Sequence, residues 1–170
     1  LGIIRNHSVG RTFIEPQQSI RALSVKLKHN VNNLFIDGKK IILIDDSIVR
    51  GTTSTKIIEM LRDAGAKEVH MRITSPPIKF PDFYGIDTPI QEQLLSANNT
   101  PDEICAFLKA DSISFLSING LYKAMGHSQG RDPKNPLFTD HCFTGDYPTK
   151  LSDNESNEEF SQLSLLSNLE

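Results

Sequence analysis

The sequence predicts an α/β fold in which a parallel sheet is flanked by helices, and three observations lead to this prediction. Residues 41–44 are continuously apolar, as in a buried strand. A helical apolar period follows this run, and residues 67–74 then alternate between apolar and polar. Strand, helix and strand in this order form the βαβ unit of a parallel sheet.

The first predicted strand is the apolar run. Residues 31–36 and 40–44 are both rich in Ile, Val, Leu and Phe, and Ile41-Ile42-Leu43-Ile44 contains no polar residue. We therefore expect a central strand that is covered on both faces. In the helix that follows, Gly65 supplies the stop and the apolar positions are Ile57, Ile58, Leu61 and Ala64.

Prolines interrupt regular structure after the second strand, at Pro76, Pro77 and Pro81, and residues 83–85 read as an extended or turn segment. A helix start follows, in which Thr100 is the N-cap, Pro101 takes the first helical position and Glu103 completes a capping box. Its expected buried residues are Ile104, Phe107 and Leu108. A short strand at 113–116 and a helix at 118–125, between Ser117 and Gly126, complete the prediction.

Charge is unevenly distributed along the 170 residues, whose net charge is -3. Residues 1–40 carry seven Lys and Arg against two acidic residues, a balance of +5, which suits a polyanionic ligand. Residues 151–170 carry five acidic and no basic residues, so we expect a domain over 1–150 and an acidic, mostly disordered tail over 151–170. The pI of about 6.0 and the lack of a recognition motif argue against nucleic acid as a partner.

The setting is expected to be cytoplasmic. No apolar run approaches the roughly 20 residues that a membrane-spanning helix needs. Cys105 and Cys142 are too few for a disulfide framework. The chain begins at Leu1 without an initiating Met, so we expect a piece of a longer protein.

The chemistry is concentrated in residues 41–53. The apolar strand ends in Asp45 and Asp46, and a loop with Ser47, Gly51 and threonines leads into a helix. Unpaired backbone amides and the dipole at a helix start bind phosphate, and glycine allows a close approach of the backbone. Two carboxylates would repel a phosphate, but they fit a sugar whose hydroxyls they bind directly or through Mg²⁺. The alternative is that Asp-Asp-Ser only caps the helix in a solvated turn.

Residues 41–53 resemble the phosphoribosyl diphosphate (PRPP) fingerprint of type I phosphoribosyltransferases. The flanking segments narrow the resemblance to the amidophosphoribosyltransferase family over about residues 1–150. These segments are Gly10-Arg11-Thr12-Phe13-Ile14-Glu15-Pro16, Val25-Lys26-Leu27-Lys28-His29-Asn30, Ser75-Pro76-Pro77-Ile78, Phe83-Tyr84-Gly85-Ile86-Asp87-Thr88-Pro89 and Cys142-Phe143-Thr144-Gly145-Asp146-Tyr147-Pro148-Thr149.

The resemblance implies the type I phosphoribosyltransferase fold, truncated at its amino-terminal side. It also implies transfer of ammonia to C1 of PRPP with inversion, which gives 5-phosphoribosylamine and diphosphate in the first committed step of purine synthesis. The ammonia would come from glutamine, hydrolysed in an amino-terminal glutaminase domain that this chain lacks. The expected partners are therefore PRPP, ammonia or glutamine through that domain, and further copies in a homo-oligomer, with no nucleic acid and no membrane.

The resemblance also assigns roles to residues. Asp45 and Asp46 would meet the ribose hydroxyls and Mg²⁺, the expected cofactor. The 5′-phosphate loop would comprise Ser47, Ile48, Val49, Arg50, Gly51, Thr52 and Thr53. Arg11, Lys26 and Lys28 would close over the diphosphate from a mobile loop, with Arg50 as a further candidate, although a solvated basic surface is the alternative.

The chain departs from some family members that hold an iron–sulfur cluster. Where those members have three of the four cluster cysteines, this chain has Asp82, Thr139 and Cys142, so we expect no cluster. The five histidines show no metal-ligand spacing and are expected to be ordinary core or surface residues. Phe80, Phe83 and Tyr84 are expected to be core and interface aromatics. Two alternative functions stay open, a phosphoribosyltransferase that salvages nucleobases and a PRPP-sensing regulator that binds nucleic acid.

Overall fold

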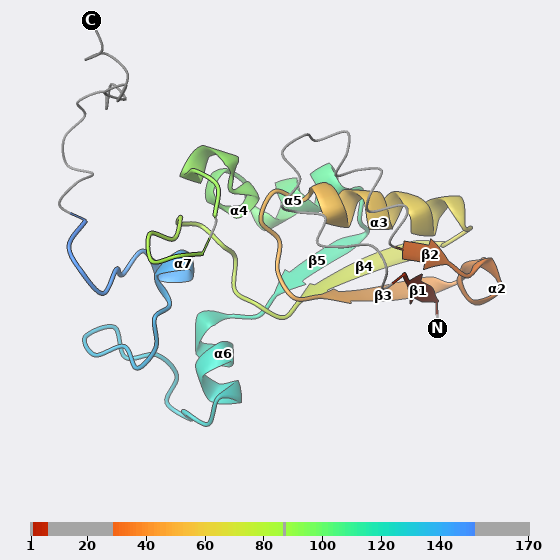
Figure 1. Ribbon diagram of the computed structural model, residues 1–170. Helices are drawn as coiled ribbons and strands as arrows, with labels where there is room; N and C mark the ends of the chain where they lie inside the picture. The colour runs from red at the N-terminus through yellow and green to blue at the C-terminus, as the bar shows by residue number, and fades with distance from the viewer. Residues whose placement is uncertain (1, 7–28, 87, 152–170) are drawn as a thin grey trace, which may run out of the picture.

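The computed structural model describes residues 2–6, 29–86 and 88–151. Its main element is a three-stranded sheet in the order β3 (Lys40–Asp45), β4 (Glu68–Ile73) and β5 (Ser112–Phe115). A two-stranded sheet pairs β1 (Ile3–Arg5) with β2 (His29–Val31). Helices α3 (Thr52–Asp63) and α5 (Pro101–Leu108) lie together over one face of the main sheet (Figure 1). Arg11, Lys26 and Lys28 lie outside the described residues, as does the predicted tail beyond residue 151.

The main sheet is parallel, as the sequence predicted. It consists of β3 (Lys40–Asp45), β4 (Glu68–Ile73) and β5 (Ser112–Phe115). The register pairs Asp45 with Ile73 and Ile73 with Phe115, so all three strands end at one edge of the sheet. That edge is where open α/β sheets bind their ligands.

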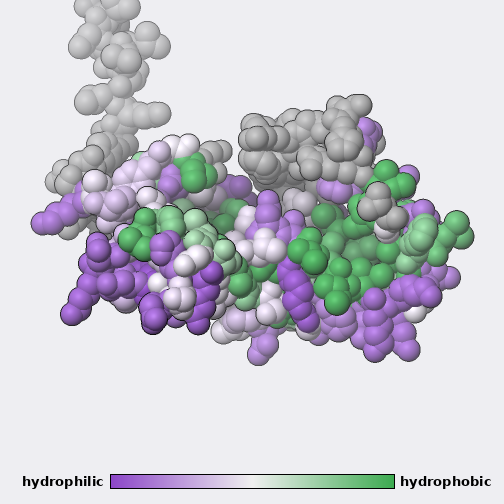
Figure 2. Space-filling model, turned by 90° about the horizontal axis from the view of Figure 1, so that it is seen from below, coloured by the Kyte–Doolittle hydropathy of each residue, from purple (hydrophilic) through white to green (hydrophobic). Residues whose placement is uncertain are grey.

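Strand β4, and not β3, is the central strand of the described sheet. Val69, Met71 and Ile73 of β4 are 0 to 3% exposed and carry the core. In β3, only alternate residues pack on the core, and Ile42 and Ile44 are 65% and 67% exposed. The prediction that β3 is covered on both faces is therefore wrong for the described residues. The apolar run correctly indicates that both faces of β3 are apolar. Among the described residues, however, only the face that α3 covers is packed against other side chains. Figure 2 shows an apolar area on the opposite side of the molecule from α3.

The first crossover helix matches its prediction closely. Helix α3 spans Thr52–Asp63 and buries Ser54, Ile57, Ile58 and Leu61. Gly65 follows the C-cap with φ of +89°, a left-handed conformation that glycine adopts at little cost. The helix begins earlier than its apolar period does, so Thr52 and Thr53 of the predicted loop form its first turn.

The second crossover contains the predicted capping box. Helix α5 (Pro101–Leu108) begins with the reciprocal Thr100–Glu103 hydrogen bonds, and it buries Ile104 and Leu108. The prediction for Phe107 is wrong, since this side chain is 53% exposed at the edge of the apolar stripe. Strand β5 begins and ends one residue before its predicted limits, and α6 (Ile118–Ala124) follows its Ser117 N-cap as expected.

The remaining elements are short. Strands β1 (Ile3–Arg5) and β2 (His29–Val31) pair in antiparallel fashion, and the apolar run at 31–36 divides between β2 and α2 (Asn33–Ile36). Between β4 and α5 lie η2 (Gln91–Gln93) and α4 (Leu95–Asn98), and α7 (His141–Thr144) comes last. Within the described residues, none of the helices has the length and apolarity that a membrane span requires.

Candidate functional site

The predicted site lies where β3 ends and α3 begins. Asp45 is the last residue of β3, Asp46 follows it, and residues 46–51 form a loop that turns back to the start of α3 (Figure 1). Thr74, just beyond β4, holds the strand end, because its backbone N–H donates to the Asp45 carbonyl at 3.0 Å. All nine residues predicted for PRPP binding are therefore placed on this one strand–loop–helix connection.

The two carboxylates sit side by side and are only partly satisfied by the backbone. Asp45 Oδ1 accepts a hydrogen bond from the Asp46 N–H at 3.1 Å, and Asp46 Oδ1 accepts one from the Ser47 N–H at 2.6 Å. Burial raises the pKa of Asp45, and the neighbouring Asp46 charge raises it further, while the Asp46 amide and His29 act in the opposite direction. A cation beside this pair would relieve both unfavourable effects, and Mg²⁺ prefers carboxylate oxygen ligands.

The loop after the carboxylates has the features of a phosphate site. Ile48 is 2% exposed and anchors the loop in the core, whereas Ser47, Thr52 and Thr53 remain partly accessible. Gly51 is the N-cap of α3 with φ of +77°, a conformation that costs other residues strain. The amides of the first helical turn have no acceptor within the helix and carry the positive end of its dipole.

Sequence reasoning missed a second segment that contacts this loop. The Leu95 N–H donates to the Val49 carbonyl at 2.8 Å, and Arg50 Nε donates to Gln93 Oε1 at 3.2 Å. Gln93 and Leu95 belong to η2 and α4, more than 40 positions along the chain from the residues they contact. The segment has no periodicity long enough to predict its elements, and nothing in its sequence indicates its partners.

A second cluster contains residues that the sequence analysis treated separately. The ligand atoms of Asp82, His141 and Cys142 lie within 4.8 Å of one another, and His141 is a buried residue, as the prediction of ordinary core or surface histidines allows. His141 Nε2 and Asp82 Oδ1 are 2.7 Å apart, and both side chains are less than 5% exposed. Nothing in the sequence indicates that these residues lie together, because Asp82 and His141 are 59 positions apart.

This cluster does not fit an iron–sulfur cluster. The other Asp82 oxygen accepts from the Tyr84 and Ile86 amides at 2.9 and 2.7 Å, so both oxygens already have partners. Burial would raise the pKa of Asp82, but these amides and His141 lower it below its ordinary value. Cys142 is the only thiol of the group, and burial raises its pKa, whereas a [4Fe–4S] cluster uses four thiolates.

The aromatic residues near this cluster are only partly buried. Phe83 and Tyr84 are 48% and 44% exposed, so they are not core residues, and their expected place at an interface stays a prediction. The Tyr84 ring packs edge-on against His141, with 5.1 Å between ring centroids, and Phe83 contacts Tyr147 at 5.5 Å. Phe80 lies beneath Gly145, where an added Cβ would approach its ring to 3.0 Å.

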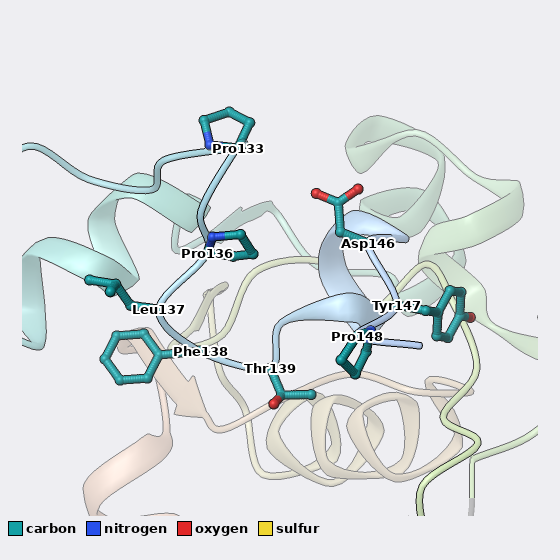
Figure 3. Close-up of a pocket in the computed structure, with 8 residues that line it drawn as sticks. All are labelled: Pro133, Pro136, Leu137, Phe138, Thr139, Asp146, Tyr147 and Pro148. Atoms are coloured by element: carbon teal, nitrogen blue, oxygen red, sulfur yellow. The ribbon is translucent and has the colours of Figure 1, made fainter. Parts of the chain in front are cut away.

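A pocket of about 360 Å³ lies away from the Asp45 loop, in the segment before and after α7 (Figure 3). Its lining is mostly proline and apolar: Pro133, Pro136, Leu137, Phe138, Thr139, Asp146, Tyr147 and Pro148. Asp146 is its one charged side chain, and Arg131 already pairs with it. This pocket therefore offers no free group for catalysis, and the Asp45 loop remains the candidate site.

Sequence comparison identifies close relatives over nearly the whole chain. The amidophosphoribosyltransferase of Rhizobium etli is 59% identical over 166 residues, which is 97% of this chain and 33% of that protein. The chloroplastic amidophosphoribosyltransferase 1 of Arabidopsis thaliana is 53% identical, over 88% of this chain and 25% of that protein. The chain thus spans about a third or less of the length of these relatives. A scan against family models finds no match.

Structural comparison agrees with the sequence. The Bacillus subtilis glutamine PRPP amidotransferase, solved in complex with ADP and GMP, matches with a TM-score of 0.72 and 48% identity over 88% of this chain and 32% of that one. A second structure, described as the allosteric regulatory enzyme of purine biosynthesis, matches with a TM-score of 0.72 and 46% identity over 92% of this chain and 33% of that one. The chain therefore belongs to the amidophosphoribosyltransferase family and has an α/β fold of the type I phosphoribosyltransferase class.

Proposed function

We propose that residues 45–53 bind PRPP and that the full-length protein transfers ammonia from glutamine to C1 of PRPP. The products would be 5-phosphoribosylamine, glutamate and diphosphate, in the first committed step of purine synthesis. The observation that carries this proposal is the pair of carboxylates at the end of β3, joined by a short loop to the amino terminus of α3. The names of the relatives, and of the solved glutamine PRPP amidotransferase, support the same substrates.

The carboxylates and the loop that follows them would bind different parts of PRPP. Asp45 and Asp46 would accept hydrogen bonds from the ribose hydroxyls and, with them, hold Mg²⁺. When bound, the metal would neutralise charge on the diphosphate. The 5′-phosphate would lie against the amides from Ser47 to Thr53, with the hydroxyls of Ser47, Thr52 and Thr53 as further donors.

The reaction needs positive charge more than it needs a nucleophile. C1 gains oxocarbenium character as the diphosphate departs, so fixed donors and cations around the leaving group lower the barrier. We assign this role to Arg11, Lys26 and Lys28, with Arg50 as a further candidate. The local charge of residues 1–40 supports this assignment, as does the Arg50 guanidinium, whose terminal nitrogens have no partner among the described residues.

The glutaminase reaction is assigned to a part of the protein outside this chain. In the described residues, burial raises the pKa of both thiols, Cys105 and Cys142. A nucleophilic cysteine needs a lowered pKa, because the thiolate is the reactive form.

We further propose that the protein is a cytoplasmic homo-oligomer that binds no nucleic acid, and that the phosphoribosyltransferase domain extends over residues 1–150.

The test uses the full-length enzyme with PRPP and an ammonium salt, with and without Mg²⁺. Release of diphosphate together with phosphoribosylamine, dependent on ammonia and on Mg²⁺, would support the proposal. If nucleobases and not ammonia were consumed, the protein would be a salvage phosphoribosyltransferase. If PRPP bound without turnover and the protein retained DNA or RNA on a filter, it would be a PRPP-sensing regulator.

We also predict that the purified full-length protein contains no iron–sulfur cluster. The reason is the donor set at Asp82, Thr139 and Cys142, which provides one thiol where a cluster needs several. Iron and acid-labile sulfide should be far below one equivalent per chain, and the visible spectrum should be flat. Near-stoichiometric iron and sulfide with visible absorbance, in protein purified without oxygen, would contradict this prediction.

A further inference from the structure

The loop that we assign to phosphate binding is held from outside by the segment of residues 91–98, which comprises η2 and α4. Two hydrogen bonds join them, one from the Leu95 N–H to the Val49 carbonyl at 2.8 Å and one from Arg50 Nε to Gln93 Oε1 at 3.2 Å. Both loop partners lie in the irregular stretch between β3 and α3. The segment therefore fixes the part of the loop that regular secondary structure does not fix.

Apolar packing reinforces the same contact. A Cβ added at Gly51 would lie 2.8 Å from Leu95 Cδ2 and 3.0 Å from Phe107 Cε1. These two side chains thus lie directly against the backbone at the start of α3. This contact gives the partly exposed Phe107 a role at the loop instead of in the sheet core.

The segment is itself rigidly built. The Asn98 side-chain amide lies 3.1 Å from each of the carbonyl oxygens of Gln91, Glu92 and Leu94. Leu94 is fully buried and anchors the segment in the protein. Because the segment is anchored in the core and tied together internally, it can hold the loop that it contacts in a fixed position relative to the core.

We propose that residues 91–98 brace the phosphate loop and that Gln93 is a positioning residue for PRPP, acting through Arg50; this rests on the proposed PRPP site. Backbone amides bind phosphate well only when they are already directed at it, because ordering a loose loop costs binding free energy. Gln93 holds the guanidinium by Nε, and the terminal nitrogens have no partner among the described residues. Its loss would loosen Arg50 and the adjoining amides without removing any group that touches the substrate.

The test compares three variants of the full-length enzyme in ammonia-dependent synthesis. Gln93→Ala removes the acceptor, and we expect the KM for PRPP to rise about three- to tenfold, the range for one hydrogen bond of ordinary net strength, with kcat changed less than about twofold. Gln93→Glu keeps an acceptor for Arg50 and should restore the KM to within about twofold of wild type. Gln91→Ala is the matched control, since this exposed side chain makes no hydrogen bond in the described residues.

Thermal unfolding separates positioning from folding, since Gln93→Ala and Gln91→Ala should unfold at the same temperature within error. The proposal is overturned if Gln93→Ala has the PRPP KM of Gln91→Ala, or if Gln93→Glu is no better than Gln93→Ala. Asp45→Asn, measured in parallel, distinguishes the two assignments. If Asp45→Asn impairs PRPP use while Gln93→Ala does not, only the positioning role of residues 91–98 is rejected. If Asp45→Asn does not impair PRPP use, the assignment of the PRPP site itself is rejected.

Discussion

Replacing Asp45 or Asp46 with Asn is expected to lower ammonia-dependent synthesis of phosphoribosylamine by about tenfold or more in the full-length enzyme. The change keeps the size of the side chain and removes one charge. A charge-assisted contact is worth about 1.5–3 kcal/mol, and about 1.4 kcal/mol corresponds to a factor of ten in rate. The effect should be at least as large at low Mg²⁺, because both carboxylates are assigned to the metal as well as to the ribose.

Two controls accompany this measurement. Glutamine hydrolysis without PRPP should barely change, because we assign that chemistry to another domain. Asp63→Asn, at the far end of α3, removes an exposed carboxylate that has no hydrogen-bond partner in the described residues, and it should leave synthesis unchanged. Wild-type rates and PRPP affinity in both the Asp45→Asn and the Asp46→Asn variants would show that these residues do not form the PRPP site.

Gly51→Val is expected to reduce ammonia-dependent synthesis at least as much as the Asn variants, and for a different reason. Its φ of +77° lies in the left-handed region, and the new Cβ would meet Leu95 at 2.8 Å and Phe107 at 3.0 Å. A β-branched residue at such a position costs about 1–3 kcal/mol of strain. Relief of that strain would move the loop amides away from the 5′-phosphate, so the KM for PRPP should rise steeply.

Gly38→Val separates strain from loop displacement. Gly38 also has a positive φ, +67°, but an added Cβ there has no neighbour within 4 Å. Both variants should lower the free energy of unfolding, whereas only Gly51→Val should impair PRPP use in protein that remains folded. A Gly51→Val enzyme with wild-type affinity for PRPP would mean that the phosphate does not approach this backbone.

Elements that are determined by neighbouring residues could be predicted from the sequence. Helix α5 is the clearest example, because Thr100, Pro101 and Glu103 form a capping box within one turn. The β3–α3–β4 unit could be predicted equally well, since the strand, the loop and the apolar face of the helix are continuous in the chain. For the same reason the whole of the predicted loop 45–53 falls on one structural connection.

Features that depend on distant contacts could not be predicted. Ile42 and Ile44 look buried in the sequence because an apolar run does not reveal which of its faces has a partner. The contacts of Gln93 with Arg50 and of His141 with Asp82 join positions 43 and 59 residues apart, and neither pair belongs to a recognisable motif. The assignment of Arg11, Lys26 and Lys28 to the diphosphate concerns residues outside the described part and stays a prediction.

Hydrogen–deuterium exchange of the full-length enzyme, with and without Mg²⁺ and PRPP, tests the central claim most directly. The amides from Ser47 to Thr53 lie in a loop and in a first helical turn, where exchange is expected to be fast because the helix provides no acceptor. If these amides bind the 5′-phosphate, their exchange should slow markedly when PRPP is added with Mg²⁺, and Asp45→Asn should weaken that protection. Unchanged exchange over residues 45–53, with protection appearing elsewhere in the protein at saturating PRPP, would contradict the account.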